Sequence, residues 1–366
     1  MDMPTTTASN AVASHLDALV RDSKVPGIQY LVVAPEDTVF AYAGGWADIA
    51  GRRPMTSSTT LMAYSMSKTI TAAAVLQLVE AGAVNLSDPI DRYLNSQPYG
   101  RDVTVRQLIS HTSGLPNPLP LAWVHPAALH GTFDERAALA TVLRQNPKRA
   151  YTPGTRFQYS NIGYWLLGTI VERASGEDFP SYVRSHVLRP LAIPPAELDY
   201  GVPDHCALAK GYLEKYSLMN LAKRFLIDRA LIGEYEGRWL RIQEHFLNGP
   251  AFGGLVGTAR GFGRFLQDQL RTHSALFNDA TRQLFYTSER TKDGTDVPMS
   301  LGWHIGAMTG TRFFFKEGGG GGFHCMMRVY PTSGIATVVM TNATGFSVRG
   351  LLDSVDSEFL RSRDRH

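Results

Sequence analysis

Residues 63–82, AYSMSKTITAAAVLQLVEAG, carry a strong signal for a buried helix. Residues 67–81 are rich in Ala and Leu and contain neither Pro nor Gly, which predicts an uninterrupted helix. Gly82 follows as a natural helix end. Because this helix shows no wholly polar face, we expect it to be buried rather than to lie half exposed on the surface.

Ser65 and Lys68 stand three residues apart at the start of this helix, a spacing that places both side chains on one face. A serine hydroxyl is a weak nucleophile at neutral pH and needs an adjacent base. A lysine can be that base where burial and neighbouring cations lower its pKa. The alternative is a helix cap followed by a surface lysine, but the Ala- and Leu-rich flank predicts that Lys68 is buried or half-buried.

The two ends of the chain have strand patterns, whereas the middle has helical ones. Short runs rich in aromatic or β-branched residues predict strands at 27–34, 38–44, 299–306, 311–316, 324–330 and 335–341. Apolar periodicity predicts helices at 10–23, 67–81, 104–110, 135–145, 161–175, 178–187, 215–232, 258–271 and 347–361. This layout predicts an α/β fold of the α+β type, an antiparallel sheet flanked by helices and interrupted by an inserted all-helical domain. We place the discontinuous α/β domain at 1–64 and 290–366 and the mainly helical domain at 65–289.

Tyr159 and Asn161 lie two residues apart, just before a predicted helix. At this spacing both side chains can point into a cleft, and a phenol near two ammonium groups can share proton transfer with them. The alternative is an ordinary aromatic residue beside an Asn helix cap. Tyr93-Leu94-Asn95 has the same spacing in a context typical of a helix end, so it serves as an internal comparison.

A third pattern is Lys316-Glu317-Gly318, which follows an aromatic strand and leads into the glycines 319–322. Glycines after a strand lysine let backbone N–H groups approach a substrate closely. The alternative is a plain glycine turn between two strands. The run is not a phosphate loop, because a strand follows it and no Gly-Lys-Ser/Thr sequence occurs in the chain.

Composition and charge exclude several classes of function. The chain has 366 residues, with 36 Lys and Arg against 33 Asp and Glu, and this excess is too small and too scattered for a nucleic-acid surface. Two cysteines exclude a disulfide framework. No apolar stretch approaches the roughly 18 residues of a membrane span, and the first residues carry no secretory signal, so we expect a cytoplasmic protein. The histidines lack metal-ligand spacing, so we expect no metal or cofactor, and we interpret His111 and His324 as structural.

In their order along the chain, these patterns resemble the serine β-lactamase and penicillin-binding protein superfamily, most closely its class C-type branch, which includes family-VIII esterases. Residues 65–68 match its Ser-x-x-Lys motif, 159–161 its Tyr-x-Asn motif and 316–318 its Lys-Thr-Gly strand motif. The resemblance spans nearly the whole chain and extends to His111-Thr-Ser-Gly-Leu-Pro, Tyr151-Thr-Pro-Gly-Thr and Gly253-Gly-Leu-Val-Gly-Thr-Ala.

The resemblance implies acyl transfer from an ester or amide substrate. Ser65 would attack a carbonyl and become acylated, while Lys68 and Tyr159 would carry its proton to the leaving group. Water or another acceptor would then release the acyl group. Which of Lys68 and Tyr159 is the base stays open, because the two titrate as a coupled pair.

The resemblance also implies the substrate contacts. Lys316 would keep the site positive, Asn161 would hold the acyl side chain, and the backbone N–H groups of Ser65 and Gly319 would form the oxyanion hole. Gly318, on the same strand, would lie beside the substrate. The oligomeric state stays open.

Glu317 departs from the family pattern, which usually has Thr or Ser there to bind the substrate carboxylate. A carboxylate at this position would repel that group unless it turns away or pairs with an Arg. We therefore expect a carboxylesterase that acts on small or medium acyl esters. The alternatives are a β-lactamase, a D-amino peptidase or an acyltransferase of the same fold, and an inactive binding scaffold, which would be free to lose the three reactive side chains.

Residues 213–247 form a second departure, because they look long and amphipathic beside compact members of the superfamily. One interpretation is one or two helices packed on the helical domain. The other is a lid over the cleft that supplies acyl-binding surface through Leu218, Met219, Phe225 or Trp239.

Overall fold

The computed structural model describes residues 3–118, 123–202, 204–221, 228–308 and 310–363. Within these residues an antiparallel sheet of seven strands is built from both ends of the chain, in the order β12-β13-β14-β15-β1-β2-β3. The strands are β1 (Gly27–Val33), β2 (Thr38–Asp48), β3 (Arg53–Pro54), β12 (His304–Met308), β13 (Thr311–Gly320), β14 (Phe323–Tyr330) and β15 (Ile335–Thr341). The expected α/β fold with an antiparallel sheet fed by both ends is confirmed.

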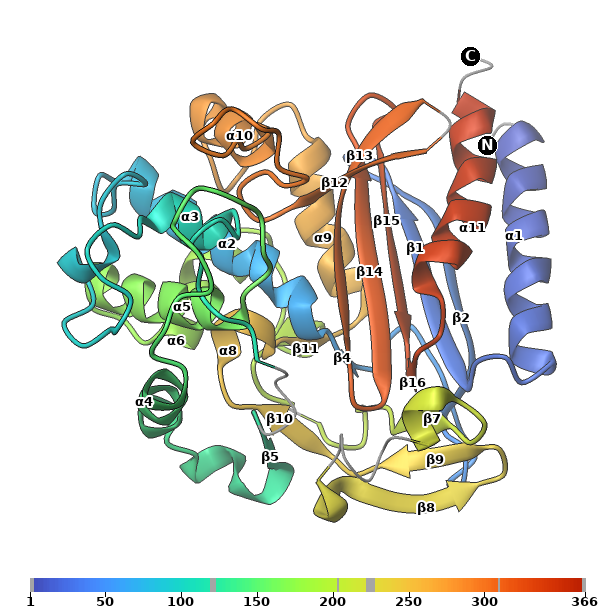
Figure 1. The fold of residues 1–366 in the computed structure, drawn as a ribbon. Coiled ribbons are helices and arrows are strands. Elements are labelled where there is room, and N and C mark those ends of the chain that lie inside the picture. The colour runs from blue at the N-terminus through green and yellow to red at the C-terminus, as the bar shows by residue number, and fades with distance from the viewer. Residues whose placement is uncertain (1–2, 119–122, 203, 222–227, 309, 364–366) are drawn as a thin grey trace.

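Helices cover both faces of this sheet, so its central strands are apolar on both sides. In β1, Ile28, Tyr30 and Val32 face one core, whereas Leu31 and Val33 face the other, as the two-residue period of a strand requires. Helices α1 (Met3–Arg21) and α11 (Val348–Arg363) pack side by side on the first face, and α9 (Ala259–Leu270) packs on the second (Figure 1).

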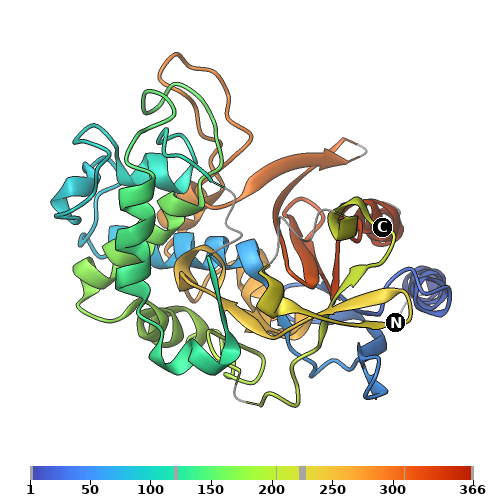
Figure 2. The ribbon, with the colours of Figure 1, turned by 60° about the horizontal axis from the view of Figure 1, so that its bottom comes forward.

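Helix α2 (Ser67–Glu80) is the centre of the helical part, and its bounds agree with the expected helix 67–81. Its residues are buried almost throughout, because other helices surround it. Figure 2 shows this helical part beside the sheet. Its other helices are α3 (Val105–Ile109), α4 (Glu135–Gln145), α5 (Asn161–Ser175), α6 (Phe179–Val183), the π-helix η5 (Arg184–Leu188), α8 (Pro250–Gly253) and α10 (Asp279–Tyr286), with 3-10 turns at η2 (Ile90–Arg92) and η4 (Ala127–Thr132).

Among the described residues, the expected helix over 215–232 is confirmed only at 218–221 and is wrong at 215–217 and 228–232. Residues 218–221 are helical, 222–227 lie outside the described residues, and a 3-10 turn, η6 (Arg229–Leu231), leads into strand β8 (Ile232–Glu236). A two-residue turn then joins β8 to β9 (Trp239–Ile242), because Gly237, at a φ of +66°, takes up the left-handed backbone that such a hairpin needs.

This hairpin belongs to a small sheet in the order β16-β7-β9-β8, below the main sheet in Figure 1. Its remaining strands are β7 (Gly211–Glu214) and β16 (Ala343–Thr344). Two short ladders complete the described strands: β10 (His245–Leu247) with β5 (Val124–Pro126), and β4 (Leu61–Met62) and β6 (Leu198–Asp199) on either side of β11 (Val256–Gly257). The domain division at 64/65 and 289/290 stays a prediction; α9, which lies within 65–289, packs on the main sheet.

Candidate active site

Ser65 lies in a 3-10 helix, η1 (Tyr64–Met66), between strand β4 and helix α2. The turn is tight, since Tyr64 has a φ of +45°, in the left-handed region that non-glycine residues rarely adopt. Ser65 is half-buried and lines a cavity. Ser67, the nearest alternative nucleophile, is fully buried, and its hydroxyl accepts a hydrogen bond from the amide of Leu255 at 3.0 Å.

The Lys68 side chain is fully buried, as its apolar flank predicts, and its Nζ lies 2.9 Å from Ser65 Oγ. The same nitrogen also donates to the carbonyl of Phe252. Burial, and then the charge of Lys316, lowers the pKa of Lys68 well below its usual value. A neutral amine at this distance can accept the hydroxyl proton of Ser65.

The Tyr159 hydroxyl donates to Ser65 Oγ at 2.7 Å, so the serine has two proton carriers. The Tyr159 ring lies close to both buried lysines, with Lys68 Nζ 5.0 Å and Lys316 Nζ 5.5 Å from the ring centre. Burial raises the pKa of Tyr159, so the phenol is neutral near neutral pH. The comparison residue Tyr93 instead donates to Asp88 at 2.7 Å.

His111 accepts hydrogen bonds from the two residues that flank Tyr159 in the sequence. Its carbonyl accepts from the amide of Gln158 at 2.8 Å, and its Nδ1 accepts from the amide of Ser160 at 3.1 Å. The two rings lie 4.3 Å apart, centre to centre. Burial, and then the charge of Lys316, lowers the pKa of His111 well below its usual value, so the ring is neutral. These contacts fit the structural interpretation of this histidine.

The strand motif 316–318 lies in β13, directly against the turn that bears Ser65. A Cβ on Gly318 would come within 2.1 Å of the Ala63 carbonyl and 2.9 Å of the Ser65 amide, so only glycine allows this approach. Lys316 is fully buried, its pKa is lowered to about 7 by burial, and its Nζ has no hydrogen-bond partner among the described residues. Gly319 lines the same cavity as Ser65.

Glu317 is held by a hydrogen bond to His324 and an ion pair with Arg349 rather than left free in the cleft. Its carboxylate accepts from His324 Nε2 at 2.8 Å and from Arg349 at 3.1 Å. These hydrogen bonds, that of His324 first, hold the pKa of Glu317 below its usual value. Pairing with an Arg is one of the conditions that weaken the repulsion of a substrate carboxylate, so the electrostatic case for ester substrates loses force.

Asn161 begins helix α5 and lines the cavity beside Ser65. Its amide and its side-chain Nδ2 both donate to Asn117 Oδ1, at 3.0 and 3.2 Å. Sequence reasoning missed Asn117, although it follows directly on the His-Thr-Ser-Gly-Leu-Pro run. It also missed Arg349, which has no local motif and reaches the site only because α11 packs against the sheet.

A family model described as "Beta-lactamase" matches residues 12–356 of the chain. The chain belongs to the β-lactamase family. The expected resemblance to the β-lactamase and penicillin-binding protein superfamily is thereby confirmed, and the class C-type branch is consistent with the relatives that follow.

Curated β-lactamase-family relatives include proteins named as peptidases. The D-alanyl-D-alanine-carboxypeptidase/endopeptidase AmpH of Escherichia coli K12 is 26% identical over 95% of this chain and 88% of that protein. The D-aminopeptidase of Brucella canis is 29% identical over 56% of this chain and 37% of that protein. Penicillin-binding protein 4* of Bacillus subtilis is 29% identical over 42% of this chain, and the match spans about a third (34%) of its length.

Solved structures share the fold of this β-lactamase-family chain along almost its whole length. The D-amino acid amidase of Ochrobactrum anthropi SV3 superposes with a TM-score of 0.80 at 22% identity, over 97% of this chain and 99% of that one. An octameric penicillin-binding protein homologue from Pyrococcus abyssi gives a TM-score of 0.79 at 23% identity, over 96% of this chain and 77% of that one.

The cavity beside Ser65 in this β-lactamase-family site has a volume of about 500 Å³ and largely apolar walls. Segment 213–247 supplies part of its lining through Met219, Asp228, Leu231, Ile242, His245 and Leu247. Of the other proposed acyl contacts, Leu218 is 86% exposed, Trp239 is buried in the core beneath α1 and α11, and Phe225 lies outside the described residues. The lid role of this segment stays a prediction.

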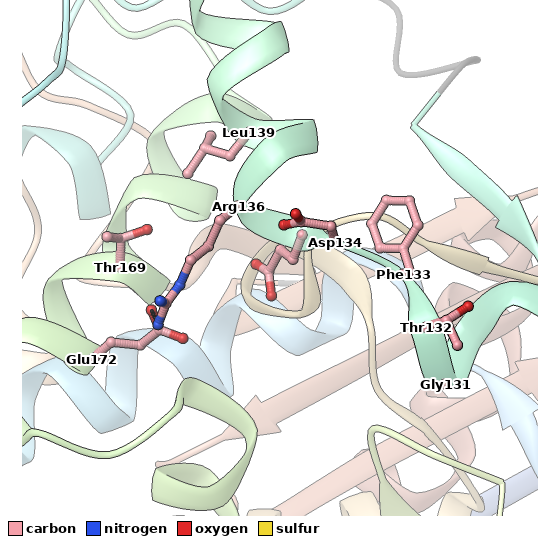
Figure 3. A pocket seen from close by; sticks show the side chains of 9 residues that line it. Gly131, Thr132, Phe133, Asp134, Arg136, Leu139, Thr169 and Glu172 are labelled. Atoms are coloured by element: carbon pink, nitrogen blue, oxygen red, sulfur yellow. Dashed lines mark ion pairs between the residues drawn. The ribbon is translucent and has the colours of Figure 1, made fainter.

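A second hollow, of about 440 Å³, lies between α4 and α5, away from Ser65 (Figure 3). Arg136 and Glu172 face each other across it at 3.8 Å. Burial raises the pKa of the neighbouring Glu135 to about 7. Its lining residues include no serine or lysine.

Among the described residues, no cluster of three or more His, Cys, Asp or Glu side chains could hold a metal ion. In the same part of the chain, no helix combines the length and the apolar character that crossing a membrane requires.

Proposed function

We propose that this β-lactamase-family chain is a serine hydrolase that acts through an acyl-enzyme on Ser65, with esters of small or medium apolar acyl groups as its substrates. One observation carries the proposal: Ser65 Oγ lies 2.9 Å from Lys68 Nζ and 2.7 Å from the Tyr159 hydroxyl. A serine hydroxyl between two proton carriers is the arrangement that nucleophilic catalysis requires. The names of the relatives, as peptidases and amidases, support hydrolysis in general.

In the proposed mechanism, Ser65 Oγ attacks the substrate carbonyl carbon as its proton leaves. Because burial lowers the pKa of Lys68 and raises that of Tyr159, we assign the amine as the proton acceptor and the phenol as the relay to the leaving group. The negative charge on the former carbonyl oxygen is stabilised by the backbone N–H groups of Ser65 and Gly319. Water, activated by the same pair, then releases the acyl group as the carboxylic acid.

The cavity lining supports an apolar acyl group. Val124, Leu231, Leu247, Phe252 and Phe323 present hydrocarbon to the space beside Ser65. Each buried methylene of a substrate contributes roughly 0.8 kcal/mol of binding. We therefore expect kcat/KM to rise from acetyl to butyryl esters.

A second candidate is the hydrolysis of amides of D-amino acids. One observation favours it: Asp228 belongs to the cavity lining, and its carboxylate can accept hydrogen bonds from a substrate ammonium group. The names of the D-aminopeptidase and D-amino acid amidase relatives point the same way.

The test combines covalent labelling with a substrate panel. A fluorophosphonate should label Ser65 of the intact protein, as read by intact mass and peptide mapping, and Ser65→Ala should abolish both labelling and turnover. Labelling at Ser67 would refute the assignment, and no labelling at all would favour the inactive binding scaffold. Rates with p-nitrophenyl butyrate, D-phenylalanine p-nitroanilide and a chromogenic cephalosporin then separate esterase, amidase and β-lactamase activity.

A further inference from the structure

Tyr64, the residue before the nucleophile, makes a buried contact with the glycine segment opposite. Its side chain is 5% exposed, and its hydroxyl lies 2.8 Å from the carbonyl oxygen of Gly321 and 3.0 Å from His245 Nε2. Its left-handed φ of +45° turns it away from the path of helix α2. Tyr64 therefore links the nucleophile turn, the end of β13 and strand β10.

The hydrogen-bond partners of His245 show which of its ring nitrogens carries a hydrogen. His245 Nδ1 lies 2.8 Å from the carbonyl of Gln243, and a carbonyl only accepts, so Nδ1 carries a hydrogen. In the neutral ring, which burial favours by lowering the pKa of His245, Nε2 is then an acceptor. The Tyr64 hydroxyl has one hydrogen and faces two acceptors, so neutral His245 competes with Gly321 for it.

Side chains pack against Gly320 and Gly321 from two sides. A Cβ on Gly320 would come within 2.3 Å of the Tyr64 ring, and one on Gly321 within 3.2 Å of the His245 ring. On the opposite side, the Thr344 hydroxyl donates to the carbonyl of Gly320 at 2.8 Å. Gly319, whose backbone N–H is one of the proposed oxyanion donors, comes immediately before Gly320 and Gly321.

We infer that Tyr64 is a positioning residue whose hydrogen bond to Gly321 sets the distance between the two oxyanion donors, the amides of Ser65 and Gly319. Tyr64 directly precedes Ser65, and Gly321 lies two residues beyond Gly319. The hydrogen bond between Tyr64 and Gly321 therefore connects the segments that carry the two oxyanion donors. The inference rests on the proposed acyl-enzyme function. It assigns to His245 a competing role, since its acceptor nitrogen draws the hydroxyl hydrogen away from Gly321.

Two substitutions with opposite expected results test this. Tyr64→Phe removes only the hydroxyl, and we expect kcat for p-nitrophenyl butyrate to fall about tenfold with KM within about twofold, because the bond acts through the transition state. The affinity for an alkyl boronic acid, which forms a tetrahedral adduct on Ser65, should fall by about the same factor. In His245→Gln, the side-chain amide N–H can donate to the Tyr64 oxygen, which leaves the hydroxyl hydrogen to Gly321, so we expect kcat to rise above that of the parent protein.

Tyr93→Phe, which removes a tyrosine hydroxyl outside the site, is the matched control and should leave both readouts unchanged. A merely structural pair would lose activity in both Tyr64→Phe and His245→Gln, and that result overturns the inference, as does a boronic acid affinity that Tyr64→Phe leaves intact. If Tyr64→Phe does not fold, a higher kcat in His245→Gln supports the inference, and an unchanged or lower kcat overturns it. Normal fluorophosphonate labelling of Ser65 in the parent protein shows that the proposed function holds, so these outcomes then test the inference alone. If the parent protein is not labelled at Ser65, the proposed function and the inference both fail.

Discussion

Replacing Lys316 by Met should shift the acid limb of the pH–rate profile to higher pH. Lys316 and Lys68 are both fully buried, and after burial itself the charge of Lys316 lowers the pKa of Lys68. Burial lowers the pKa of Lys316 to about 7, so this residue is charged below that pH and there disfavours the protonated form of Lys68. Without that charge, Lys68 holds its proton to higher pH, and the free amine that accepts the serine proton forms later.

The size of the shift follows from the geometry. Lys68 Nζ lies 5.0 Å and Lys316 Nζ 5.5 Å from the centre of the Tyr159 ring, so the two nitrogens are at most 10.5 Å apart, the sum of the two distances. At an effective dielectric constant of about 20, two unit charges at this separation repel each other by about 1.6 kcal/mol. One pKa unit corresponds to about 1.4 kcal/mol, so we expect a shift of at least about one unit.

The assay is kcat/KM for p-nitrophenyl butyrate as a function of pH, because this ratio reports the pKa values of the free enzyme. Met keeps the apolar stem of the lysine and removes the charge, which limits repacking. Lys292→Met, at an exposed lysine in a charged turn, is the matched control and should leave the limb in place. An acid limb that stays where it is in Lys316→Met, or moves to lower pH, would show that Lys68 is not the base or that Lys316 does not act on it.

Tyr159→Phe should lower kcat by roughly 10² to 10⁴, the scale of a general acid–base group, while Tyr93→Phe leaves steady-state turnover unchanged; a larger loss in Tyr93→Phe would mean that the wrong tyrosine was chosen. Glu317→Thr should raise kcat/KM for a chromogenic cephalosporin about tenfold, or about 1.4 kcal/mol, and leave kcat/KM for p-nitrophenyl butyrate nearly unchanged. Equal changes for both substrates would contradict a role of Glu317 in specificity. Asp356→Ala should lower the free energy of unfolding in urea by about 3 kcal/mol, because the carboxylate that lies 3.6 Å from the fully buried guanidinium of Arg328 is removed, and an unchanged midpoint would refute this.

Sequence patterns were sufficient where the structure depends on neighbours along the chain. The helix 67–81 and the burial of Lys68 both follow from an apolar run that holds no Pro or Gly, and α2 ends within one residue of the predicted position. Most sheet strands at both ends were located for the same reason, because alternation and β-branched composition are local properties, whereas the strand predicted at 299–306 is found at His304–Met308.

Patterns were insufficient where distant segments meet. The ion pair of Glu317 with Arg349 joins β13 to α11, and nothing near either residue indicates the other. The β8–β9 hairpin lies in segment 213–247, for which one interpretation was one or two helices, and the left-handed conformation of Gly237 reverses the chain there instead. The hydrogen bond between Tyr64 and Gly321 likewise becomes visible only once β13 lies against the nucleophile turn.

Strand β1 lies in the interior of the main sheet, with β2 on one side and β15 on the other. On the ribosome, β2 is available almost at once, but β15 begins only at residue 335 and is synthesised long after β1. Until then, the largely apolar strand Gly27–Val33 has unpaired backbone groups along one edge, the kind of edge that pairs with other chains. Pairing β1 with β15 also closes a long loop of chain, which makes this step slow. The yield of refolding should therefore fall steeply with protein concentration, and Ser65 should acquire reactivity only after β13 has joined the sheet beside it.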